Sequence, residues 1–339
     1  MAIKKLGTQT VKLENPPSIE GFYTIVGPKE GDGPLSKYFD MILEDDLWGQ
    51  ESWEKAEAKI QEECIKAAVN NGGLSIKDID YLIAGDLLNQ IIATGYSARQ
   101  ISIPFFGLYG ACSTMTESLS LGAMLVDGGY GDKVICATSS HFSTAERQFR
   151  FPLEYGTQRK FSSQWTVTGA GATLLSSTGN GPYVKYITTG KIIDSGIKDV
   201  NNMGGAMAPA AMDTLLYHFR DTGHKPSDYD LIMSGDLGHI GKEIVIDMMK
   251  KEGYDLKGIF TDAGVEIFDK DVQDTHSGGS GCACSATVFN SYVLKEMQKG
   301  NLNKVLIMST GALHSTTSIQ QGESIPCIAH AVVLDKKKE

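Results

Sequence analysis

The chain carries one series of sequence segments twice, and this duplication limits the possible folds more than any other feature. Three pairs of segments align in the same order: 78–87 with 228–237, 110–139 with 281–310, and 171–175 with 330–334. Apolar runs can resemble one another by chance, but three matches in one order indicate a repeated structural unit. A chain of 339 residues is long enough for two such units, each with a core of its own.

Both copies combine helical patterns with apolar runs typical of buried strands. Residues 115–126 and 287–297 are predicted helices that should end at the glycines Gly128, Gly129 and Gly300. Apolar residues at helical spacing predict a further helix over residues 53–69.

Strands alternating with helices indicate an α/β fold whose sheets are covered by helices. We therefore predict two pseudo-equivalent α/β halves in a layered α/β/α arrangement. The first half covers residues 1–178 and the second covers residues 179–339.

Composition excludes several classes of function. The formal net charge is -10, which argues against a broad surface for nucleic acid or anionic lipid. The basic tail at residues 336–338 is expected to be solvated, with a membrane-surface contact as the alternative. No signal peptide is evident in residues 1–17, and no apolar run reaches the length of a membrane span. Six scattered cysteines predict free thiols in a reducing compartment, with no metal site and no cofactor.

A turn around Cys112 is the strongest candidate site. Residues 103–109 are predicted to form a buried strand, and residues 110–114 turn into the next helix, where Thr114 and Glu117 have the spacing of a capping box. A thiol at a helix N-terminus is favoured as thiolate, and the same position attracts anions. The second copy has Ala283 at this position, which indicates a single site, whereas the remaining cysteines in apolar runs are expected in the core: Cys64, Cys136 and Cys327.

A duplicated α/β unit with a cysteine at a strand-to-helix turn in its first copy only resembles the thiolase superfamily, over nearly the whole chain. The similar beta-ketoacyl-acyl-carrier-protein synthases pair that cysteine with a histidine and an asparagine from the second half. Here the histidine position falls on Gly235 or Asp236, and Ser280 stands where asparagine is expected. The resemblance therefore implies a retained pocket without the pair that stabilises the transition state of condensation.

Longer strings resemble the stage V sporulation protein AD family in particular. They are residues 85–90, 106–114, 137–141, 144–150, 204–211 and 278–286. The resemblance implies a component of the apparatus that moves dipicolinate (pyridine-2,6-dicarboxylate), usually as its calcium chelate, across the inner forespore membrane. Such a subunit would lie on the cytoplasmic side, as a peripheral protein held by other stage V sporulation membrane proteins.

A planar dianion needs donors on two sides and a slot for its ring. Ligands of α/β sheets gather at the carboxyl ends of strands, and a guanidinium can bind a carboxylate through two hydrogen bonds. The predicted ligand-binding residues are Cys112, Asn89, Ser140, His141, Arg147, Gly279 and Ser280, with Arg150 as a second charged candidate. Two alternatives stay open: His141 could instead cap a strand, and either arginine could serve packing alone.

Three functions follow from this sequence. The first is a non-catalytic dipicolinate-binding protein. The second is an acyltransferase resembling beta-ketoacyl synthase III, with Cys112 as nucleophile and one of three histidines as its base: His141, His239 or His276. The third is a structural adaptor with a relic pocket. By analogy with the superfamily we also expect a homodimer formed at the sheet edge of the first half, through the apolar run at residues 134–137.

Overall fold

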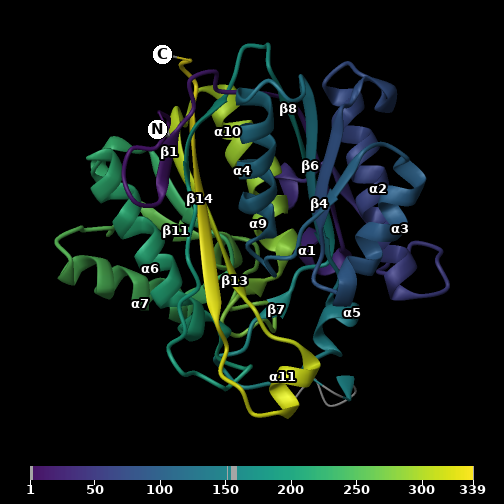
Figure 1. The fold of residues 1–339 in the computed structure, drawn as a ribbon. Coiled ribbons are helices and arrows are strands. Elements are labelled where there is room, and N and C mark those ends of the chain that lie inside the picture. The colour runs from purple at the N-terminus through teal and green to yellow at the C-terminus, as the bar shows by residue number, and fades with distance from the viewer. Residues whose placement is uncertain (1–2, 151, 154–158, 339) are drawn as a thin grey trace.

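The fold consists of two similar halves that share a central layer of helices (Figure 1). The structure is a computed structural model that describes residues 3–150, 152–153 and 159–338. The strands are β1 (Thr10–Lys12), β2 (Ser18–Val26), β3 (Met41–Ile42), β4 (Tyr81–Gly85), β5 (Phe105–Gly107), β6 (Lys133–Ser140), β7 (Trp165–Thr166), β8 (Gly169–Ser176), β9 (Tyr183–Thr188), β10 (Leu231–Ser234), β11 (Phe260–Asp262), β12 (Gly279–Ser280), β13 (Lys304–Ala312) and β14 (Cys327–Asp335).

Helices cover both faces of each sheet. The α-helices are α1 (Pro28–Gly31), α2 (Trp53–Asn71), α3 (Ile92–Ile101), α4 (Thr114–Asp127), α5 (Phe142–Glu146), α6 (Met203–Thr222), α7 (Gly238–Lys251), α8 (Ala263–Glu266), α9 (Cys282–Val288), α10 (Leu294–Lys299) and α11 (Thr316–Gln320). A π-helical turn, η6 (Phe289–Val293), joins α9 to α10, and the short 3-10 turns are η1 (Ser36–Tyr38), η2 (Ile76–Asp78), η3 (Asn89–Ile91) and η5 (Pro226–Asp228).

Strand order confirms the duplication. The first half has the order β2-β8-β6-β4-β5 and the second has β9-β14-β13-β10-β11. In each half a long strand, β6 or β13, runs parallel to one neighbour and antiparallel to the other. The boundary predicted after residue 178 falls in the turn between β8 and β9. Strand β1, at the start of the chain, pairs with β9 of the second half.

Strands β2 and β9 pair at one point, so both halves belong to one sheet. Figure 1 shows α4, α9 and α10 between the two halves of this sheet, with α2 and α3 outside one half and α6 and α7 outside the other. Each half is therefore a sheet between helix layers, as predicted. Close packing of the central layer depends on a glycine in β8, because a Cβ atom at Gly171 would lie 2.5 Å from the carbonyl oxygen of Ala286.

Predicted helices and their ends agree with the structure in most places. Helices α2 and α4 extend slightly beyond their predicted ranges, α4 is followed by Gly128, and α10 ends at Gly300 in the left-handed conformation. The second central helix was predicted to begin at residue 287, but α9 begins at Cys282. All seven residues of α9 are buried, so its first turn has no polar face that periodicity could detect.

Three local predictions were wrong. The run at residues 103–109 forms only the short strand β5, which lies at the sheet edge with all three of its residues exposed. The predicted capping box is absent, because Ser113 is the N-cap and Thr114 lies inside α4, where its hydroxyl donates to the carbonyl of Ala111. Residues 134–137 cannot form a dimer interface, because β6 is buried between β4 and β8.

Two further findings concern membrane and thiol chemistry. No helix in the described part of the chain is long and apolar enough to cross a membrane. All six cysteines are free and buried. Cys64, Cys136 and Cys327 lie in the hydrophobic core, as predicted.

Candidate functional site

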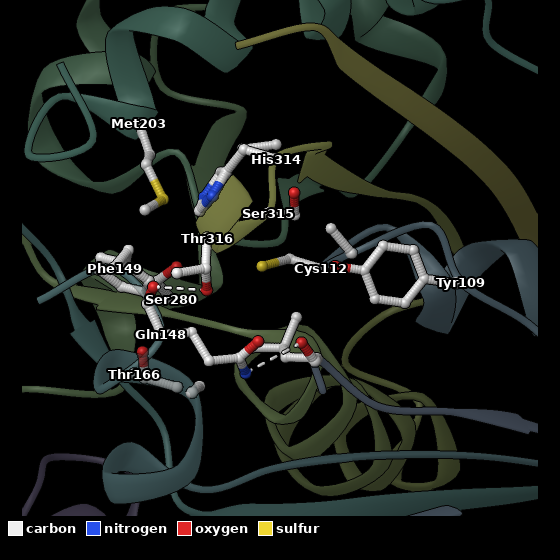
Figure 2. A pocket seen from close by; sticks show the side chains of 14 residues that line it. Tyr109, Cys112, Gln148, Phe149, Thr166, Met203, Ser280, His314, Ser315 and Thr316 are labelled. Carbon is white, nitrogen blue, oxygen red and sulfur yellow. Dashed lines mark hydrogen bonds between the residues drawn. The ribbon is translucent and has the colours of Figure 1, made fainter. Parts of the chain in front are cut away.

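A cavity of about 50 Å³ lies where the two halves meet, next to Cys112 (Figure 2). Its walls come from the turn before α4, from residues after α5, from β7 and β12, and from the segment that joins β13 to α11. The lining residues are Leu87, Tyr109, Ala111, Cys112, Ala145, Gln148, Phe149, Thr166, Met203, Ser280, Ala312, His314, Ser315 and Thr316. Both copies of the duplicated unit therefore contribute to one site.

The sulfur of Cys112 points into this cavity (Figure 2). Burial, and next the nearby Asp236, raise the pKa of the Cys112 thiol well above its usual value. The prediction that the helix start favours a thiolate is therefore wrong. Cys112 precedes the first residue of α4 by two positions, and desolvation with a negative neighbour outweighs the helix dipole.

Asp236 lies directly behind the cavity wall, in the turn after β10. Its side chain is fully buried, and its two carboxylate oxygens accept hydrogen bonds from Thr310 Oγ1 at 2.5 Å and from Ser280 Oγ at 3.3 Å. The Cys112 thiol lies close enough to this carboxyl for the two groups to affect each other's pKa. Burial raises the pKa of Asp236 to about 7, and the charge of Asp262 acts in the same direction. A carboxylic acid thus occupies one of the two positions matched to the histidine of the condensing enzymes.

The duplication explains why Asp236 faces the cysteine. Its counterpart in the first half, Asp86, accepts backbone hydrogen bonds from Leu88 and Thr94, both at 2.7 Å, and so stabilises its own turn. In the second half Asp262 takes over this role, accepting from the backbone N–H groups of residues 237 and 238 at 2.8 and 2.9 Å. The side chain of Asp236 is therefore available to the site.

A second, smaller cavity of about 10 Å³ adjoins the first and shares four lining residues with it: Phe149, Thr166, Met203 and Ser280. Arg150 lines this second cavity and forms an ion pair with the fully buried Glu146. Within the described part of the chain, its buried Nε atom has no hydrogen-bond partner. Arg150 consequently places a positive charge and an unused donor beside the main cavity.

Of the seven predicted ligand-binding residues, the structure brings Cys112 and Ser280 together in the cavity wall. Gly279 holds the backbone before Ser280, because its carbonyl accepts from Gln164 Nε2 at 2.9 Å and a Cβ atom there would lie 2.8 Å from Ile267. Asn89 is exposed in η3 and is not part of the lining.

Three other predicted residues are bonded elsewhere. Ser140 Oγ donates to the carbonyl of residue 167 at 2.7 Å and accepts from the N–H of residue 283 at 3.1 Å. His141 caps α5 through Nδ1 and bonds the carbonyl oxygen of residue 46 through Nε2 at 2.9 Å. Arg147 forms an ion pair with Glu54 and lies over the ring of Trp53. None of the three lines the cavity, because these local partners hold their side chains in other directions.

The other two histidines considered as bases also lie outside the lining. His276 bonds the carbonyl of Lys160 and the carboxylate of Asp274, and His239 lies in α7.

Sequence reasoning missed His314, Thr316 and the role of Asp236. His314 follows β13, the counterpart of β6, and its ring packs edge-on against Phe149 at 5.7 Å. Thr316 Oγ1 donates to the carbonyl of Gln148 at 2.9 Å and so connects the two sides of the cavity. The strand-end argument that selected His141 after β6 would have selected His314 after β13, had it been applied to both copies.

Comparisons with known proteins agree with this architecture. A sequence model described as stage V sporulation protein AD matches residues 7–335. Stage V sporulation protein AD of Bacillus subtilis (strain 168) is 46% identical over 334 residues, which cover 98% of each chain.

Solved structures with a similar fold include 3-oxoacyl-[acyl-carrier-protein] synthase III from Aquifex aeolicus VF5. Its TM-score is 0.57 at 14% identity, with 94% of this chain and 99% of that chain covered. OleA from Xanthomonas campestris, co-crystallised with cerulenin, has a TM-score of 0.61 at 15% identity, with 95% and 97% covered.

Proposed function

The chain belongs to the stage V sporulation protein AD family, and from this we propose that it binds dipicolinate in the cavity beside Cys112 without catalysing a reaction on it. One observation carries the proposal. The cavity between the halves is lined with hydroxyl, amide and imidazole groups, while a buried carboxyl occupies one of the two positions matched to the catalytic histidine of the condensing enzymes.

Charge and hydrogen bonding support an anionic ligand. One carboxylate would lie at the Cys112 and Ser280 end, and the other would point toward Arg150 in the adjoining cavity, whose Nε donor has no partner among the described residues. The rings of Tyr109 and Phe149 supply flat apolar surface for a pyridine ring.

The cavity must widen to admit the ligand. A water molecule occupies about 30 Å³ of liquid, so about 50 Å³ holds one or two waters and not an aromatic ring with two carboxylates. The wall between Gln148 and Thr316 is the natural place to open, because one hydrogen bond and the contact of Phe149 with His314 close it.

A bulky side chain on this wall tests the location. Thr316→Trp should weaken dipicolinate binding at least tenfold, about 1.4 kcal/mol, because the indole would occupy the cavity mouth. Calorimetry with and without calcium measures the effect. Thr317→Trp is the matched control, since Thr317 is the exposed neighbour in the same helix and should bind as wild type does. Equal affinity in the two variants would place any ligand elsewhere.

Acyl transfer is the less well supported alternative. Its nucleophile would have to be the Cys112 thiolate, yet burial and Asp236 keep this group protonated. The likeness to 3-oxoacyl synthase III concerns the fold, at 14% identity. A structural adaptor without a ligand is the outcome if no dipicolinate binds.

We further propose a homodimer that forms through β5. Among the described residues, one edge of this strand pairs with no other strand, and three exposed apolar side chains lie on it or just after it: Phe105, Phe106 and Tyr109. Phe106→Lys should convert the dimer to a monomer in sedimentation velocity, whereas Tyr130→Lys, a substitution at another exposed aromatic residue, should not. A wild-type monomer at micromolar concentration would contradict the proposal.

We place the protein on the cytoplasmic side of the inner forespore membrane, held there by other stage V sporulation membrane proteins. A groove near both termini supports contact with the membrane surface, because four lysines line it: Lys4, Lys12, Lys185 and Lys338. Fractionation of sporulating cells tests this location, because the protein should leave the membrane fraction when the other stage V membrane proteins are deleted.

A further inference from the structure

We propose that Asp236 becomes protonated when the ligand binds, so that the cavity takes up one proton together with each dicarboxylate. This inference rests on the proposed function and adds the chemical form in which the site accepts its ligand. It concerns a residue that lies behind the cavity wall and not in the lining itself.

Hydrogen bonding is the first argument. Thr310 and Ser280 donate to Asp236, and the Cys112 thiol lies close enough to it for the two groups to affect each other's pKa. While the carboxyl is ionised, it attracts the protons of the two cavity-facing groups, Ser280 and Cys112, and leaves only lone pairs toward a ligand. A neutral Asp236 frees both protons for the ligand carboxylate.

Charge is the second argument. The titratable groups that act on Asp236 or are affected by it come from four surrounding elements, and they are Cys112, Asp262, Cys282, Cys284 and Cys327. None of these groups carries a positive charge, and no salt bridge to Asp236 occurs within the described residues. A ligand carboxylate in this cavity would lie near an ionised Asp236 whose charge no cation neutralises. Two carboxylates that share a site hold one proton between them.

The direction of the pH dependence follows. With a pKa of about 7, Asp236 is about half protonated near neutrality in the free protein, and a bound anion raises this pKa further. Binding above pH 7 therefore requires proton uptake. The dissociation constant should be constant below about pH 6 and rise about tenfold per unit above pH 7, until the pKa of the bound state is reached.

Calorimetry at pH 7.5 in buffers of different ionisation enthalpy counts the protons directly. We expect net proton uptake, of at most one proton per dipicolinate, by the calcium-free wild-type protein. Asp236→Asn, which imitates the neutral acid, should bind with no uptake and with a pH-independent affinity.

Two further variants test whether the proton that is taken up belongs to Asp236. Glu57 is another fully buried carboxyl, with its pKa raised to about 8, but it bonds Ser139 and Thr144 away from the cavity, so Glu57→Gln should keep the full uptake. Thr310→Val removes a donor that favours the ionised form, so it should move the onset of the affinity loss to higher pH.

The outcomes are distinguishable. Binding by wild type with no proton uptake and no pH dependence would overturn this inference and leave the proposed function standing. An equal loss of uptake in Glu57→Gln would also overturn it, because the proton would not belong to Asp236. An absence of binding from pH 6 to pH 9 would overturn the proposed function and this inference with it.

Discussion

Asp236→His should make Cys112 react with iodoacetamide at pH 7.5 at least tenfold faster than in the wild-type protein, because the substitution favours the reactive thiolate. The wild-type thiol is buried beside a carboxyl, and both features raise its pKa. An imidazole in place of the carboxyl removes the negative neighbour and can accept the thiol proton. Mass spectrometry of the labelled Cys112 peptide over time gives the rate.

Asp236→Asn is the control for this comparison. It removes the negative charge without adding a base, so its labelling rate should lie between those of wild type and Asp236→His. In denaturant all three proteins should label at one rate, which shows that the difference comes from the folded site. If the histidine variant is folded by circular dichroism and labels no faster than wild type, Asp236 does not control the thiol.

Phe289→Ala should lower the free energy of unfolding by about 3–5 kcal/mol, the usual cost of emptying a buried phenylalanine site. Phe289 is fully buried at the start of η6, the turn that joins α9 to α10. Stabilities of whole domains are about 5–15 kcal/mol, so the change would be large. Urea unfolding followed by circular dichroism measures it.

Phe161 provides a matched control, because it is the same residue type with 89% of its surface exposed. Phe161→Ala should change the stability by less than about 0.5 kcal/mol. A similar loss in both variants would mean that the central layer contributes no more to stability than the surface does.

The architecture could be predicted from the sequence because duplication is visible in local patterns. Each of the two apolar runs that end in Gly-Asp-Leu predicted a strand followed by a turn. The two predicted strands are β4 and β10. Helix α9 was harder to place, since a helix buried on all sides lacks the polar stripe that marks a boundary.

The site was less predictable, because side-chain directions depend on partners far away in the chain. His141 and Arg147 follow a strand that ends near the cavity, but residue 46 and Glu54 hold them elsewhere. Asp236 was matched to a catalytic position by alignment alone. Its side chain is held by Thr310 and Ser280, which no local pattern could place beside it.

Titration of the wild-type protein with dipicolinate at pH 6.5 by calorimetry tests the central claim most directly. We predict saturable binding with one ligand per chain, which Thr316→Trp weakens at least tenfold and Thr317→Trp does not. No heat at millimolar dipicolinate, with or without calcium, would contradict the claim and leave a structural adaptor as the function of this chain.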